Sequence, residues 1–172
     1  CGAIYSNPIK LEVNQIIATI GTPAPFMINA ATTRINVSID VTDRNLYWDL
    51  GIALVAPDGT EVMLQGPRSS LCIVNPNNNR VNALFTNKID KLSGDTINWC
   101  INTKLITGTF AATGNWNLLN GKDPSNGAWQ VRVYDAYNAS AVIDGYLKSA
   151  TLSFTDLNTN GDSVTVSYNS GN

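Results

Sequence analysis

The sequence predicts an all-β sandwich of roughly eight to ten strands, built as one domain over residues 1–172. Asn occurs 22 times among many Thr, Ser and Gly residues, whereas Glu occurs only twice. Asn and Gly favour turns, Thr favours strands, and a shortage of Glu disfavours helices. Several segments also alternate apolar and polar residues between turn signals, and no segment shows a convincing helical period.

Two segments in the first half carry the clearest strand signals. Residues 34–42 alternate apolar and polar side chains, which predicts a strand with one buried and one solvated face. The next run, 50–54, leads through Pro57-Asp58-Gly59-Thr60 into 62–64. Proline presets φ, Asp caps the backbone and Gly takes the left-handed position, so this region predicts a β-hairpin. An N-terminal candidate strand, Ile9–Ile20, is less regular.

The second half continues the pattern after a loop-rich passage at 66–82, which contains two prolines and three consecutive Asn residues. Strand character resumes in the segments 97–101, 129–133, 147–157 and 164–168. A Gly- and Asn-rich passage at 114–127 separates the first two of these strands.

Composition argues against several functional classes. Apolar residues make up 44% of the chain, yet no apolar run approaches the roughly 20 residues of a transmembrane helix. The net charge is −2 and no Lys/Arg cluster stands out, so no nucleic-acid partner is expected. The sequence contains no histidine, which removes Ser-His-Asp and Cys-His catalytic units and imidazole metal ligands. We therefore expect a protein that is not an enzyme.

The three cysteines, Cys1, Cys72 and Cys100, cannot all pair with one another. Cys72 lies in a loop-like segment and Cys100 ends a strand-like one, so we predict a Cys72–Cys100 disulfide. The alternative is two buried thiols. Cys1 would then be left for lipid attachment, as in a processed lipoprotein, or for an intermolecular link, unless it marks only a processing boundary.

Four motifs follow one another along the chain. They are the strand Asp49-Leu50-Gly51-Ile52-Ala53-Leu54, the turn Ala56-Pro57-Asp58-Gly59-Thr60, the strand Gly127–Asp135 preceded by Gly114-Asn115-Trp116, and the strand Gly145-Tyr146-Leu147 leading to Leu152-Ser153-Phe154. In this order they resemble the P-domain that follows the subtilisin-like protease domain in proprotein convertases. The resemblance covers residues 30–155, with 1–29 and 156–172 as terminal strand extensions.

The resemblance implies a jelly-roll-like antiparallel sandwich that positions a neighbouring protease and, in some members, binds calcium. Asp49 and Asp135 match the two recurrent acids of the family, which makes them the first calcium candidates. The alternative is two carboxylates that accept hydrogen bonds from loop amides. The chain departs from the family at 44–48, where a His-Thr-Tyr-type segment is common, and it holds no protease domain.

The segment Asp156–Ser163 places oxygen-bearing side chains at alternate positions before a glycine, as an EF-hand calcium loop begins. The weaker calcium candidates are therefore Asp156, Asn158, Asn160 and Asp162. However, the twelfth position is Ser167 instead of Glu, and both flanks are strand-like. Asn160-Gly161 is also a preferred two-residue hairpin turn, so we favour a hairpin.

Tryptophan side chains offer a candidate surface for sugar stacking. Trp129 is in phase with Val131 and Val133, which predicts a core position. Trp116 lies in a polar loop and is the glycan-stacking candidate.

We predict a non-catalytic, extracellular or cell-surface structural module, such as a filament subunit, that self-assembles through terminal β-strands. The candidate donor strands are Ile9–Ile20 and Ser163–Tyr168. The alternative is an accessory calcium- or carbohydrate-binding module of a secreted protease or hydrolase. The expected partners are copies of the chain or another secreted protein, Ca²⁺ is the one cofactor considered, and membrane contact would come only through lipid on Cys1.

Overall fold

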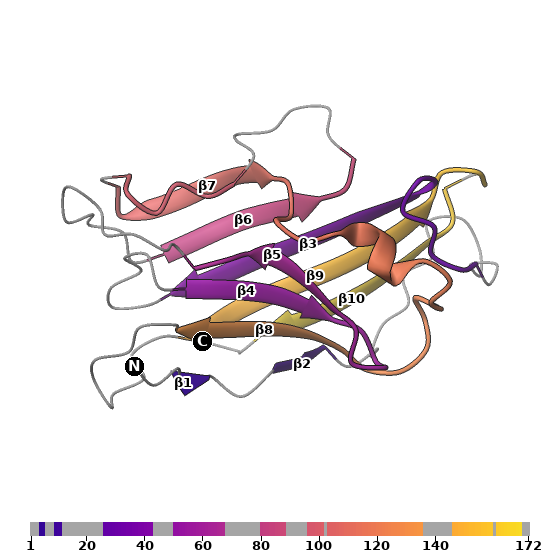
Figure 1. Cartoon of the computed structure of the whole chain (residues 1–172), viewed down its shortest axis with the longest axis horizontal. Helices are drawn as coiled ribbons and strands as arrows, with labels where there is room; N and C mark the ends of the chain where they lie inside the picture. Colours follow the sequence, from indigo (N-terminus) through magenta and orange to yellow (C-terminus); the bar gives the residue numbers. More distant parts are fainter. Residues whose placement is uncertain are drawn as a thin grey trace.

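The computed structural model describes residues 4–5, 9–11, 26–42, 50–67, 80–88, 96–101, 103–135, 146–159 and 161–169. These residues form two β-sheets that lie face to face and one short 3-10 helix, η1 (Trp116–Leu119), at one end of the sandwich (Figure 1). The prediction of an all-β sandwich is confirmed.

Sheet A has the strand order β1-β8-β4-β5, with β2 also paired to β8. Its strands are β1 (Ile4–Tyr5), β2 (Ile9–Leu11), β4 (Leu50–Val55), β5 (Glu61–Gln65) and β8 (Trp129–Asp135). The predicted hairpin is confirmed as β4 and β5, which pair antiparallel. In its turn the Thr60 N–H donates to Asp58 Oδ1 over 3.0 Å, and Gly59 has a φ of +87°.

Sheet B has the strand order β10-β9-β3-β6-β7. Its strands are β3 (Thr33–Thr42), β6 (Arg80–Thr86), β7 (Leu105–Phe110), β9 (Tyr146–Asp156) and β10 (Ser163–Asn169). All its neighbours pair antiparallel except β6 and β7, which are parallel. The β6–β7 pair is therefore the exception, among the described strands, to the antiparallel pairing that the resemblance implies. Parallel neighbours need a long connection, and residues 87–104 supply one.

Residues 97–101 form a turn, so the strand predicted there is wrong. The Cys100 N–H donates to Asn98 Oδ1 over 3.0 Å, and the Ile101 N–H donates to the Asn98 carbonyl oxygen over 3.4 Å. An Asn side chain that accepts from the backbone two residues later competes with a sheet ladder, which explains the turn.

The core lies between the two sheets and follows the period-two alternation of the strands. Trp129 from sheet A and Phe154 from sheet B are both 0% exposed, and their ring centroids are 4.9 Å apart. The indole Nε1 of Trp129 donates to the Pro124 carbonyl oxygen over 3.2 Å. The predicted core position of Trp129 is confirmed.

The loop leading into β3 is fastened to the end of β6 by Asn87 and Lys88. Asn87 Nδ2 donates to the carbonyl oxygens of Ala30 over 3.0 Å and Thr33 over 2.8 Å. Asn87 Oδ1 accepts from the Ile35 N–H over 2.7 Å, and Lys88 Nζ donates to the Ala30 carbonyl oxygen over 2.9 Å. These bonds satisfy backbone N–H and carbonyl groups in the loop and at the start of β3.

On the outer face of sheet B, Asp40 of β3 is paired with Arg80 of β6. The Arg80 Nε and Nη2 atoms donate to Asp40 Oδ1 and Oδ2 over 2.8 and 2.6 Å. The hydrogen bond from Arg80 lowers the pKa of the Asp40 carboxyl, against the opposing effect of burial, and the positive charges of Arg80 and Lys148 lower it further. This bidentate pair links two central strands.

Because the pKa of Asp40 is lower in the folded than in the unfolded state, the pair contributes stability above the unfolded pKa of about 3.9. That contribution is lost as the pH falls through the folded pKa. We expect Asp40→Asn to lower the free energy of unfolding by about 1–2 kcal/mol at pH 7. In urea titrations the difference from wild type should shrink below about pH 4. Asp58→Asn is the matched control. Its carboxylate pairs with Lys122 but is 57% exposed, so the substitution should change stability less. A loss that is independent of pH would contradict this assignment.

Candidate functional site

The outer face of sheet A carries an organised set of side chains across three strands. Alternation turns Ile52, Val62 and Val131 into the core, where each is at most 1% exposed. The residues next to each of them along the strand therefore face outward. The outward set, called here the Tyr134 cluster, comprises Gly51 of β4, Glu61 and Met63 of β5, and Arg132 and Tyr134 of β8.

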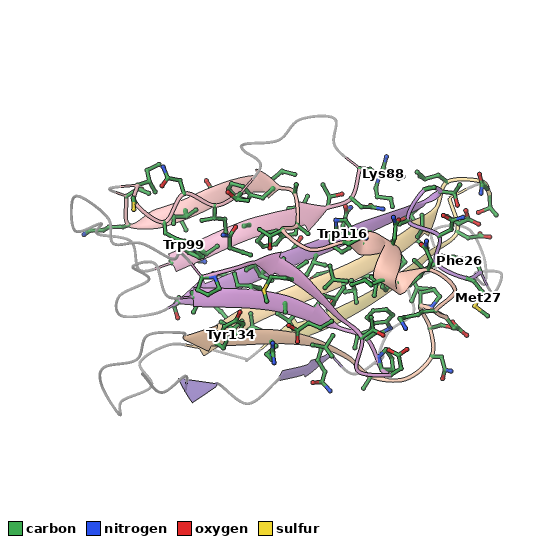
Figure 2. The ribbon with its side chains drawn as sticks, in the orientation of Figure 1. Phe26, Met27, Lys88, Trp99, Trp116 and Tyr134 are labelled. Atoms are coloured by element: carbon green, nitrogen blue, oxygen red, sulfur yellow. The ribbon has the colours of Figure 1, made fainter. Side chains whose placement is uncertain are left out.

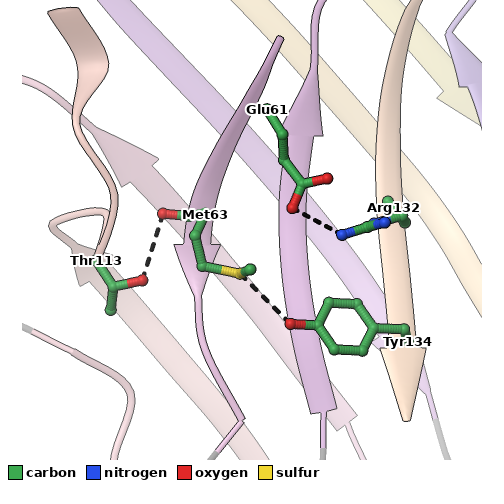
Figure 3. Close-up of polar contacts among 5 residues, drawn as sticks. All are labelled: Glu61, Met63, Thr113, Arg132 and Tyr134. Atoms are coloured by element: carbon green, nitrogen blue, oxygen red, sulfur yellow. Dashed lines mark hydrogen bonds and ion pairs between the residues drawn. The ribbon is translucent and has the colours of Figure 1, made fainter. Parts of the chain in front are cut away.

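Tyr134 lies across β4 because Gly51 has no side chain. The two residues are directly opposite each other in the β4–β8 ladder. A Cβ atom on Gly51 would overlap the Tyr134 ring, so the ring rests on the glycine backbone. The phenol hydroxyl reaches Met63 Sδ on β5 at 3.7 Å (Figure 3). Glycine in a central strand often marks such a close approach.

Arg132 crosses β4 beside Tyr134 and ends at Glu61. Its Nη2 atom donates to Glu61 Oε1 over 2.7 Å. The Arg132 side chain is 30% exposed and the Glu61 side chain 31% exposed. The guanidinium carbon lies 5.2 Å from the Tyr134 ring centroid, within the range of a cation–π contact. Ala53, opposite Arg132 in the ladder, is 0% exposed.

The edge of sheet A beside the cluster is covered by the chain that follows β7. The Thr113 N–H donates to the Leu64 carbonyl oxygen over 3.1 Å, and the Gly114 N–H donates to the Met63 carbonyl oxygen over 2.7 Å. Thr113 Oγ1 also contacts the Met63 carbonyl oxygen at 3.4 Å (Figure 3). A Cβ on Gly114 would lie 2.8 Å from the Met63 nitrogen, so glycine permits this approach.

Chemically, the Tyr134 cluster offers a half-buried aromatic ring beside a carboxylate–guanidinium pair whose formal charges cancel. Among the described residues, no three acidic, histidine or cysteine side chains gather closely enough to hold a metal ion. No helix in the described part of the chain is long and apolar enough to cross a membrane. The arrangement suits hydrogen bonding and stacking.

Of the weaker calcium candidates, Asp156 ends β9, and Asn158 and Asp162 lie between β9 and β10. β9 and β10 pair antiparallel on either side of this turn, as the hairpin interpretation predicts. The Asp156 N–H donates to the Asp162 carbonyl oxygen over 2.9 Å, and Asp156 Oδ1 accepts from the Asn158 N–H over 3.0 Å. Gly161 has a φ of +90°, and Asn160 lies outside the described residues. Calcium binding at this turn stays a prediction.

Asp135 is the last residue of β8, while Asp49, Cys1 and Cys72 lie outside the described residues. Cys100 is half-buried in the turn at 96–101, and its disulfide with Cys72 stays a prediction.

Trp116 begins η1 and packs partly against the core, at the end of the sandwich near Phe26 and away from Tyr134 (Figure 2). It is half-buried, which leaves less of its ring for stacking than its polar sequence context predicts.

Sequence reasoning missed the Tyr134 cluster. Its one local signal is Gly51, a glycine inside a strand whose apolar residues Leu50, Ile52 and Leu54 alternate regularly.

Comparison with known proteins adds no relative. No family model matches the sequence, and neither a curated protein nor a solved structure matches the chain.

Proposed function

We propose that the chain is a non-catalytic structural module, extracellular or at the cell surface and similar to a P-domain, whose copies join through the two edges of sheet B. The observation that carries this proposal is the composition of the edge strands. β10 reads SVTVSYN and β7 reads LITGTF, and neither contains a charged residue or a proline. Edge strands of monomeric proteins usually carry such residues to prevent association, so uncharged edges favour it.

The edges of sheet A differ from those of sheet B. Residues 113–114 bond to β5 at one edge, and β1 and β2 pair with β8 at the other. In sheet B, no described strand lies beyond β7 or β10. Leu105, the first residue of β7, is 40% exposed, which adds apolar surface to that edge. The contrast supports association through sheet B.

Strand direction favours a head-to-tail arrangement. β10 runs parallel to β3, because each is antiparallel to β9. β7 runs opposite to β3, because β6 is antiparallel to β3 and parallel to β7. In two copies related by translation, β10 of one copy would therefore lie antiparallel to β7 of the next. Such a contact uses different surfaces on the two copies and does not close, so it can extend into a filament.

The terminal strands need not leave their own sheets in this arrangement. Ile9–Leu11 pairs with β8 as β2, and the candidate donor at the C-terminus pairs with β9 as β10. Edge-to-edge addition extends sheet B while both pairings stay intact. We therefore favour edge addition over strand donation.

Ser167→Lys should reduce self-association. Ser167 is exposed on edge strand β10, and a lysine there would bring a charge to the contact in every copy. We expect wild-type protein to form concentration-dependent multimers or filaments by light scattering and negative-stain electron microscopy. The variant should need about tenfold more protein to do so, a change of about 1.4 kcal/mol per contact.

The control is Ser38→Lys, the same substitution on central strand β3. Ser38 and Ser167 are both exposed, and both pair with Thr151 of β9. Ser38→Lys should therefore leave self-association unchanged. A wild-type monomer at all concentrations, or equal effects of the two substitutions, would contradict the proposal.

Calcium binding at Asp135 is a second candidate function, supported by strand register. Asp135 is directly opposite Leu50 in the β4–β8 ladder, and Asp49 is the residue before Leu50 in the sequence. Ca²⁺ takes six to eight oxygen ligands, which carboxylates and backbone carbonyls at such a strand end can supply.

Millimolar Ca²⁺ should raise the thermal unfolding midpoint of the wild-type protein, because a ligand that binds only the folded state stabilises it. At about 100 times the dissociation constant the gain is about 2.7 kcal/mol. Asp135→Asn and Asp49→Asn should each abolish the shift, whereas Asp162→Asn should leave it intact. The absence of a shift in wild type would remove this candidate.

A further inference from the structure

We propose that Asn126 is a site of spontaneous deamidation in the folded protein, whereas the fold protects Asn120 from the same reaction. Asn120-Gly121 and Asn126-Gly127 are the two Asn-Gly pairs that lie wholly within the described residues. Asparagine deamidates most readily before glycine, because glycine has no side chain to hinder attack by its own backbone nitrogen. The modification consumes water, needs no enzyme, and is independent of the edges of sheet B and of calcium.

The reaction passes through a cyclic imide. The Gly127 amide nitrogen loses its proton to a base from solvent and attacks the side-chain Cγ of Asn126. The new N–Cγ bond forms while the bond from Cγ to Nδ2 breaks, and the nitrogen leaves as ammonia with a proton from solvent. Water then opens the ring, giving aspartate if the new bond breaks and isoaspartate if the original peptide bond breaks. The net change is the uptake of water and the loss of ammonia.

The two Asn-Gly pairs are alike in exposure and in backbone conformation. Asn120 and Asn126 are both exposed, and so are the glycines that follow them. Gly121 has a φ of +79° and Gly127 a φ of +81°. Neither property therefore gives a reason for the two asparagines to react at different rates.

Hydrogen bonds hold both reacting groups of the first pair. Asn120 Oδ1 accepts from the Ala30 N–H over 2.7 Å, and the Gly121 N–H donates to the Ile28 carbonyl oxygen over 2.8 Å. The loop before β3 thus fixes the side chain that would be attacked and the nitrogen that would attack it. This loop must open locally before Asn120 can react.

The turn that carries the second pair holds its earlier residues only. Asp123 Oδ1 accepts from the Ser125 N–H over 2.9 Å and from Ser125 Oγ over 2.7 Å. The Asn126 N–H donates to the Asp123 carbonyl oxygen over 3.4 Å. No residue in the described part of the chain forms a hydrogen bond with the Asn126 side chain or the Gly127 N–H. Deamidation at Asn126 therefore breaks no hydrogen bond of either reacting group.

The product would change a packed contact between two turns. Gly127 lies against Pro57 in the β4–β5 turn, since a Cβ atom on Gly127 would be 2.7 Å from Pro57 Cβ. Isoaspartate adds a methylene group to the backbone directly before Gly127, and both products add a negative charge. Modification at Asn126 would therefore disturb this contact.

Tryptic peptide mapping by mass spectrometry tests the proposal, because trypsin separates the two pairs. Residues 123–132 contain Asn126 as their only asparagine, and residues 105–122 contain Asn120. The protein is incubated at mildly alkaline pH, circular dichroism confirms that it stays folded, and fragment spectra locate each change from amide to acid. We expect Asn126 to convert about tenfold faster than Asn120 or more, because two hydrogen bonds protect Asn120. In protein unfolded with guanidinium chloride the two rates should become similar.

Asn126→Gln is the control variant, because a glutamine side chain would have to close a larger and slower-forming ring. It should suppress the conversion in residues 123–132 and leave residues 105–122 unchanged. Methylation by an isoaspartyl methyltransferase, which labels isoaspartate, should fall in the same variant. The proposal is overturned if Asn120 converts as fast as Asn126 in the folded protein, or if Asn126 fails to convert until the protein is unfolded.

Discussion

Trp129→Ala is expected to lower the free energy of unfolding by about 3–5 kcal/mol. The indole is 0% exposed, packs on Phe154 at 4.9 Å and donates from Nε1 to the Pro124 carbonyl oxygen over 3.2 Å. Truncation would leave a cavity between the two sheets and a buried carbonyl without its donor. Both effects destabilise the folded state. The cavity would persist because neighbouring strands cannot move independently to fill it.

Urea unfolding followed by far-ultraviolet circular dichroism measures this change. Trp116→Ala removes the same side chain from a half-buried position at η1, and it should cost about 1–2 kcal/mol. Equal losses for the two substitutions would show that Trp129 is not part of the core in solution.

Asn87→Ala is expected to destabilise the fold by about 2–4 kcal/mol although it removes no apolar surface. The side chain makes hydrogen bonds with the backbone of Ala30, Thr33 and Ile35, at distances of 2.7 to 3.0 Å. Alanine cannot replace any of these bonds. Ile35 is 0% exposed, so solvent reaches its N–H poorly and the lost partner is costly.

The matched control is Asn82→Ala on β6, where the side chain is exposed, and it should change stability by no more than about 0.5 kcal/mol. Asn87→Asp is a second variant that keeps the Oδ1 acceptor for Ile35 but loses both donated bonds. The second carboxylate oxygen of this variant would face the Ala30 and Thr33 carbonyl oxygens, so at neutral pH it should be at least as destabilising as Asn87→Ala. Amide hydrogen exchange at the start of β3 should rise in both Asn87 variants, and unchanged exchange would contradict this role.

Strands with strong local alternation could be predicted from the sequence. β3 alternates apolar and polar residues from Arg34 to Thr42, and Pro57-Asp58-Gly59-Thr60 contains the residues that its turn requires. The position of Trp129 in the core also followed from its phase with Val131. In these cases the information lies within a few residues, so a sequence pattern is sufficient.

The strands on either side of the long connection between β6 and β7 are harder to predict from the sequence. β6 begins just after a run of three Asn residues, and its alternation of Val81, Ala83 and Phe85 was hidden by that loop signal. The parallel pairing of β6 and β7 depends on how the connection between them travels through space. Local sequence does not report that path.

The Tyr134 cluster escaped prediction for a related reason. Tyr134 meets Gly51, and Arg132 meets Glu61, only because the register of β8 against β4 and β5 brings them together. Each residue alone is ordinary for an outward position on a strand. Gly51 is the one local sign, and its role depends on the Tyr134 ring that lies against it in the folded structure.

The pairing of β3 with β9 has a consequence for how the protein is made. β3 lies early in the described chain and its partner β9 lies near the end. β1 and β2 likewise pair with β8, which is far later in the sequence. A ribosome therefore releases the early strands long before their partners exist. Pairings between distant segments form slowly, and unpaired strands in the meantime expose apolar surface. The growing chain should need protection by chaperones until the last strands emerge, and a chain cut short before β9 should aggregate.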